Sequence, residues 1–66
     1  MELAMYLGND FIASISLNTG QITEPGYVGQ LKRKLMDDNG NVLQYTINEP
    51  EFWIVNFSSG FARQAQ

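Results

Sequence analysis

The sequence predicts an all-β domain: a small antiparallel meander of about five to six short strands that closes into an SH3-like barrel or a small sandwich. Three observations support this prediction. Apolar and polar residues alternate over 11–18, turn signals recur at short intervals, and residues 52–57 are almost continuously apolar. We assign residues 1–57 to a single β domain and residues 58–66 to a C-terminal tail.

The first strand is predicted over residues 2–7, and a two-residue turn beginning at Gly8 leads into a second strand over 11–17. A third, short strand is expected over 21–24. It ends at Pro25, because proline has no amide hydrogen to give to a sheet.

Both faces of this first hairpin carry apolar side chains. Pairing across the turn places Tyr6 opposite Phe11, and we expect these two rings in the core. Leu3, Met5 and Ile12 then lie on the other face, which carries no charge between Glu2 and Asp10. An exposed strand pair normally carries charge, so we expect this uncharged face to be an interface.

The longest predicted hairpin spans residues 31–47. If its loop has three residues and places Gly40 in the left-handed region, Leu35 pairs with Leu43 and polar residues pair with one another. Gly40→Val is then expected to destabilise the fold by about 1–2 kcal/mol.

The same segment also allows a helix. Val28, Leu31, Leu35 and Met36 recur at helical spacing, and the residues between them are mostly good helix formers. The alternative fold is therefore α+β, with a short helix at about 28–36.

The last predicted strand, residues 52–57, is apolar at every position except Asn56 and should be buried on both faces. The pattern ends at Ser58. Phe61 is the large apolar residue of the expected tail, so we expect it either to fold back onto the domain or to reach a neighbour.

Catalytic and metal-binding motifs are missing from the sequence. It contains no histidine and no cysteine, which excludes Ser-His-Asp, Cys-His and His-based zinc sites. The acidic stretch 37–41 has the wrong spacing for a calcium loop, because Asn48 stands where a bidentate glutamate is needed. We expect a non-enzymatic protein with no metal and no cofactor.

The net charge of −3 argues against binding to nucleic acid or to anionic membranes. The basic cluster Lys32, Arg33 and Lys34 alternates between the two faces of a predicted strand. With Tyr45 as a stacking ring, these residues are the possible nucleic-acid contacts.

The expected function is a small structural or protein–protein interaction module that forms a homo-oligomer or docks on a larger protein. Its predicted interface residues are Leu3, Met5, Ile12 and Phe61. One alternative is a small-barrel nucleic-acid-binding protein. Another is an acidic inhibitor that occupies a basic site on its target, with contact charges at Asp37, Asp38, Glu49 and Glu51. No apolar run is long enough to span a bilayer, and no signal peptide is evident, so we expect a cytoplasmic location without membrane contact.

Overall fold

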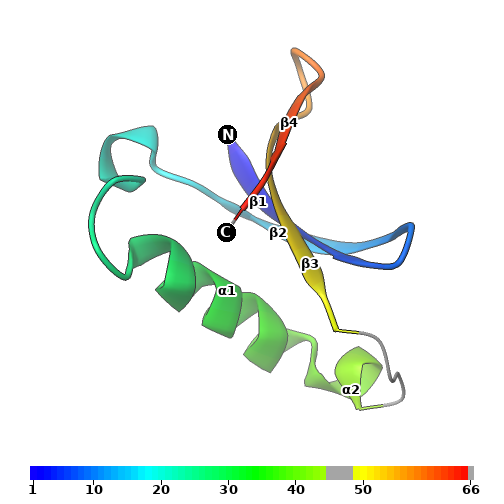
Figure 1. Ribbon diagram of the computed structural model, residues 1–66. Coiled ribbons are helices and arrows are strands. Elements are labelled where there is room, and N and C mark those ends of the chain that lie inside the picture. Colours follow the sequence, from blue (N-terminus) through cyan, green and yellow to red (C-terminus); the bar gives the residue numbers. More distant parts are fainter. Residues whose placement is uncertain (45–48, 66) are drawn as a thin grey trace.

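The computed structural model describes residues 1–44 and 49–65, which form an open sheet of four antiparallel strands with a helix on one face (Figure 1). The strand order in the sheet is β2-β1-β3-β4. In chain order the elements are β1 (Glu2–Leu7), β2 (Asp10–Ser16), the 3-10 turn η1 (Thr19–Gln21), α1 (Tyr27–Asp38), α2 (Gly40–Leu43), β3 (Glu51–Asn56) and β4 (Phe61–Gln64).

The predicted all-β barrel or sandwich is wrong, because the sheet is open and its two edges are β2 and β4. The first half of the hairpin predicted over residues 31–47 is helical instead, because residues 27–38 form α1. The alternative helix at about 28–36 lies within α1. Residues 40–43 form α2 rather than the returning strand, and residues 45–47 of that strand lie outside the described residues. The short strand expected over 21–24 is replaced by η1 and turns.

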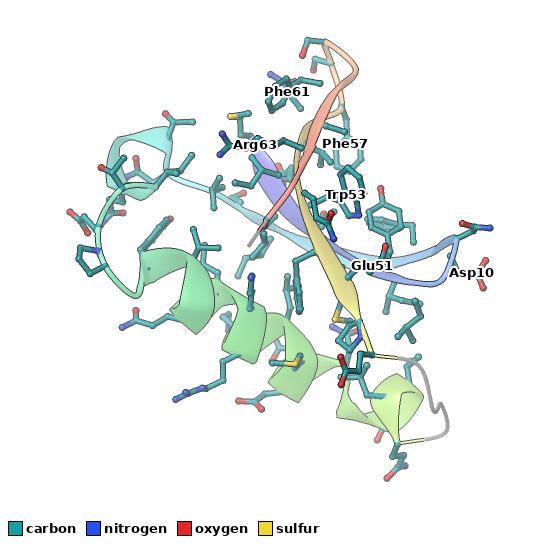
Figure 2. All side chains as sticks on the ribbon, in the orientation of Figure 1. Asp10, Glu51, Trp53, Phe57, Phe61 and Arg63 are labelled. Carbon is teal, nitrogen blue, oxygen red and sulfur yellow. The ribbon has the colours of Figure 1, made fainter. Side chains whose placement is uncertain are left out.

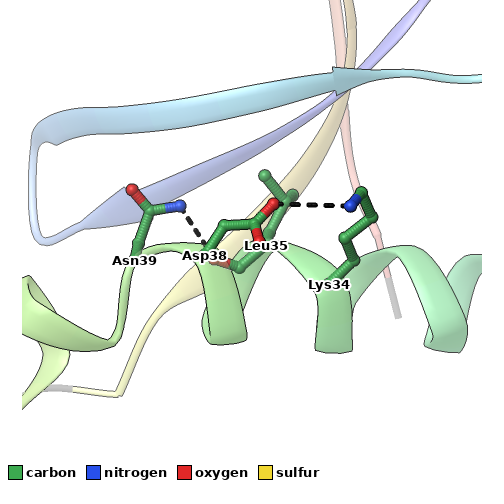
Figure 3. A network of polar contacts seen from close by, with 4 residues as sticks. All are labelled: Lys34, Leu35, Asp38 and Asn39. Carbon is green, nitrogen blue, oxygen red and sulfur yellow. Dashed lines mark hydrogen bonds and ion pairs between the residues drawn. The ribbon is translucent and has the colours of Figure 1, made fainter.

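The start and end of α1 have local causes. Gly26 precedes the helix with a φ of 82°, a left-handed conformation that glycine adopts readily. At the other end, the Asn39 side-chain Nδ2 donates to the Leu35 carbonyl at 2.8 Å, and the Asn39 amide donates to the same oxygen at 3.2 Å (Figure 3). The amide bond is the ordinary i+4 bond of the helix, and the side-chain Nδ2 adds a second donor to the same carbonyl at the helix end. Lys34 and Asp38 form an exposed ion pair at 3.6 Å across the last turn of the helix.

A β-bulge sets the register of β1 against β2. Tyr6 faces Phe11 as predicted, but the register shifts between Met5 and Tyr6. Ile12 is skipped in the pairing, so Met5 faces Ala13 instead of Ile12. The predicted register is therefore wrong beyond the bulge. A single extra residue on one strand is enough to change which side chains share a face.

The core lies between the sheet and α1. Leu3 and Met5 are fully buried there, together with Leu35 from the helix. Phe52 and Ile54 of β3 complete the cluster from the neighbouring strand. The face of β1 that was expected to be an interface is thus the face that α1 covers.

Strand β4 is formed by residues that were expected to be a tail. Phe61–Gln64 pairs with β3, and the Ala65 amide extends the pairing by donating to the Phe52 carbonyl at 2.8 Å. Lys32 of α1 contacts the same two residues. Its ammonium lies 5.4 Å from the centre of the Phe52 ring and 3.5 Å from the Ala65 carbonyl oxygen. These contacts connect the C-terminal end of the chain to β3 in the sheet and to α1 in the helix layer. Among the described residues, no helix is both long enough and apolar enough to cross a membrane.

Candidate interaction face

Four aromatic residues gather on the side of the sheet opposite α1, and we call Tyr6, Phe11, Trp53 and Phe57 the aromatic face. Tyr6, Phe11 and Trp53 come from β1, β2 and β3, and Phe57 begins the turn after β3. The sheet register places Ala4 opposite Trp53, so Trp53 and Tyr6 share the outer face. Figure 2 shows Trp53 and Phe57 on one side of β3, whereas Arg63 lies on the other.

The rings contact one another across the strands. Tyr6 and Phe11 meet edge to face, with ring centres 5.6 Å apart, and Phe11 meets Phe57 in the same way at 6.2 Å. Aromatic pairs favour this geometry because the positive ring edge approaches the negative ring face. Phe11 and Phe57 nevertheless remain 50% and 61% exposed. The aromatic face is therefore an ordered cluster in which two of the four rings remain about half exposed to solvent.

A small apolar layer lies at the base of the aromatic face. Ala4 and Val55 occupy outer-face positions of β1 and β3, and both are buried. Neither belongs to the cluster beneath α1. Since α1 is on the opposite side of the sheet, side chains of the outer face must cover them. The outer face is consequently more apolar than the solvated face of an ordinary antiparallel sheet.

A pocket of about 270 Å³ opens on this face. It is lined by Tyr6, Gly8, Asn9, Glu51, Trp53, Val55 and Ala62. Glu51 stands directly opposite Tyr6 in the register of β1 and β3, and its side chain is exposed. One carboxylate thus accompanies two aromatic rings in the pocket wall.

A larger hollow of about 540 Å³ lies on the helix side, lined by Ile22, Val28, Ile54, Arg63, Gln64 and Ala65. One helix of about 10 Å diameter cannot cover four strands spaced about 4.8 Å apart. The hollow follows from this incomplete cover on the side of β3 and β4. Its single charged lining residue, Arg63, has no carboxylate or nucleophile beside it in the wall.

The fold places three of the four predicted interface residues in or against the core and one on the surface. Leu3 and Met5 are fully buried beneath α1, where a partner cannot reach them while the domain is folded. Ile12 is partly buried against the same core. Phe61 alone is well exposed, at 45%, on the edge strand β4.

The predicted nucleic-acid residues lie in the helix layer. Lys32, Arg33 and Lys34 are on α1, and Lys32 is engaged with Phe52 and Ala65. Tyr45 falls outside the described residues. Helix α1, which carries the basic cluster, lies on one side of the sheet (Figure 1), and the aromatic face is on the other.

The acidic residues named as inhibitor contacts are also spread over both layers. Asp37 and Asp38 are exposed at the end of α1, Glu49 precedes β3, and Glu51 lies in the outer pocket. Within residues 1–44 and 49–65, no group of three or more acidic residues could hold a metal ion.

Sequence reasoning missed the aromatic face because it placed Tyr6 and Phe11 in the core. One signal could have revealed it. With a one-residue shift in β2, Leu3, Met5 and Ala13 fall on a single face, and that arrangement separates the small and aliphatic residues from the aromatic rings.

The fold and this face define a two-layer α+β protein with an exposed aromatic surface on its antiparallel sheet. No family model matches the chain, and no curated protein or solved structure matches it significantly. Its function is therefore inferred from the surface chemistry of the described residues.

Proposed function

We propose that the protein is a non-enzymatic interaction module that docks on a protein partner or on a second copy through its aromatic face. The observation that supports this most strongly is the half-exposed ring cluster of Phe11 and Phe57, which is held in order by edge-to-face contacts. Aromatic residues are enriched at protein interfaces, and burying such a side chain fully contributes about 1.5–3 kcal/mol. An ordered aromatic surface also loses little conformational entropy when a partner docks.

A protein partner fits this surface better than a nucleic acid does. Binding to a strand of nucleic acid combines stacking rings with cations that neutralise the phosphates. The outer-face positions of the four strands carry Glu2 and Glu51 but no lysine or arginine. The cations of α1 lie on the opposite side of the sheet from these rings, so the rings and the cations do not form one continuous surface for a nucleic-acid strand.

The remaining parts of the proposal come from the sequence. The chain has no histidine and no cysteine, which supports a function without catalysis, cofactor or metal. A cytoplasmic location without membrane contact belongs to the same proposal. An inhibitor that used all four named carboxylates is less well supported, because Asp37 and Asp38 belong to the helix layer and Glu51 to the outer face.

Site-specific photo-crosslinking in the source cell tests the proposal. Benzoylphenylalanine replaces Phe57, which preserves an aromatic ring on the aromatic face, and in a matched control it replaces the exposed Arg33 on α1. We expect a discrete adduct from position 57, of the mass of one partner or of a dimer, and none from position 33.

A second variant tests whether the adduct from position 57 depends on the aromatic face. Phe11→Ser removes a half-exposed ring that contacts Phe57, so it should reduce the yield from position 57 while circular dichroism shows an intact fold. No adduct at either position, or equal adducts at both, would rule out the aromatic face as the docking surface.

A further inference from the structure

The pocket on the aromatic face combines two aromatic rings with one carboxylate. Tyr6 and Trp53 line it from neighbouring strands, and Glu51 lies opposite Tyr6. Its volume of about 270 Å³ is below the ~300–1,000 Å³ of typical small-molecule sites. The pocket is therefore sized for one side chain of a partner rather than for a whole metabolite.

The one charged residue in the pocket wall is Glu51. Among residues 1–44 and 49–65, the Glu51 carboxylate has no ion-pair or hydrogen-bond partner. No lysine or arginine lines the pocket. A cation placed there gains the attraction of the ring faces and of a carboxylate together.

We infer that this pocket binds a cationic side chain, arginine or lysine, presented by a protein partner. The inference rests on the proposed docking function of the aromatic face and names the chemistry of its occupant. Tryptophan is the best cation–π acceptor among the side chains, and arginine is the cation found most often over aromatic rings. The surrounding rings of Phe11 and Phe57 supply apolar contact for the partner residues that flank the cation.

A second copy of the chain is a poorer source of this cation. Of the four lysines and arginines of the chain, Lys32 lies over Phe52, Lys34 pairs with Asp38, and Arg63 lines the hollow on the helix side. This leaves Arg33 of α1 as the cation that a second copy would present. Docking of α1 from one copy into the outer face of the next would also be head to tail. Such contacts build open filaments unless the rotation closes a ring.

Trp53 is the only tryptophan of the chain, so its fluorescence and its single indole NH resonance report directly on the pocket. The probes are the capped pentapeptides Gly-Gly-Arg-Gly-Gly and Gly-Gly-Lys-Gly-Gly. A third peptide with norleucine at the centre keeps the length of the side chain and removes its charge. We expect saturable shifts of the indole resonance and of the Gly8 and Asn9 amides with the arginine and lysine peptides only.

Two matched variants test the carboxylate. Glu51→Gln should weaken binding of the arginine peptide by about fivefold, the effect of one partly screened charge contact. Glu49→Gln removes an exposed carboxylate close by in the chain but outside the pocket wall, and it should leave binding unchanged. Equal responses to the norleucine and arginine peptides, or equal effects of the two variants, would overturn the inference.

The outcomes separate this inference from the proposed function. If the adduct from position 57 forms but the arginine peptide produces no shift at the pocket, the docking face stands and the cationic occupant is rejected. If light scattering and the mass of the adduct identify a second copy as the partner, the assignment to a different protein is also rejected. An adduct with a different protein that is reduced by Glu51→Gln and unaffected by Glu49→Gln supports both the docking face and the cationic occupant.

Discussion

Gly26, immediately before α1, shows how one residue decides where a helix begins. Its φ of 82° lies in the left-handed region, where a Cβ crowds the following carbonyl at a cost of about 1–2 kcal/mol. Gly40 does not have a positive φ, and no atom lies within 4 Å of a Cβ added there. The expectation that Gly40 occupies a left-handed loop position is therefore wrong.

We expect Gly26→Ala to lower the free energy of unfolding by about 1–2 kcal/mol. Gly40→Ala should leave it unchanged or raise it by about 0.4–1 kcal/mol, because alanine has fewer unfolded conformations to lose. Urea unfolding followed by Trp53 fluorescence measures both. Equal destabilisation at the two positions would contradict the assigned backbone conformations.

At the scale of the element, the end of α1 carries a side-chain hydrogen bond and is not followed by a left-handed glycine. Asn39→Ala removes the bond from Nδ2 to the Leu35 carbonyl, and we expect a loss of about 0.5–1.5 kcal/mol in the free energy of unfolding. Lys34→Gln breaks the Lys34–Asp38 pair, whose side chains are about 60% exposed, and should change stability by less than about 0.5 kcal/mol. Circular dichroism at 222 nm during chemical unfolding compares the two. A larger effect from Lys34→Gln would reverse this ranking.

At the scale of the whole molecule, the strand order determines which backbone amides open to solvent first. β1 and β3 are the inner strands, whereas β2 and β4 each have one free edge. We expect the slowest hydrogen exchange in β1 and β3 and clearly faster exchange in the four-residue β4, because edge strands open without disrupting the rest. NMR-detected exchange at a concentration where light scattering shows a monomer measures this order. Amides in β4 as protected as those in β1 would contradict the observed sheet.

The sequence by itself determined the elements whose signals are local. Period-two alternation and the turn at Gly8 identified β1 and β2 within one residue of their observed ends. The apolar run beginning at Phe52 identified β3 in the same way. These patterns can be read locally because alternation and turn chemistry depend only on neighbours along the chain.

Tertiary structure decided the rest. Residues 27–38 have apolar spacing that allows both strand and helix, and the choice of helix allows Leu35 to pack on Leu3 and Met5. The bulge at Ile12 placed Ala13 and Ile15 of β2 opposite Met5 and Leu3, and packing of α1 on this aliphatic face left Tyr6 and Phe11 on the outside. Strand β4 carries no strong pattern and forms because the edge of β3 offers it unpaired backbone groups. In each case the deciding energy comes from contacts between residues distant in the chain, which no local pattern records.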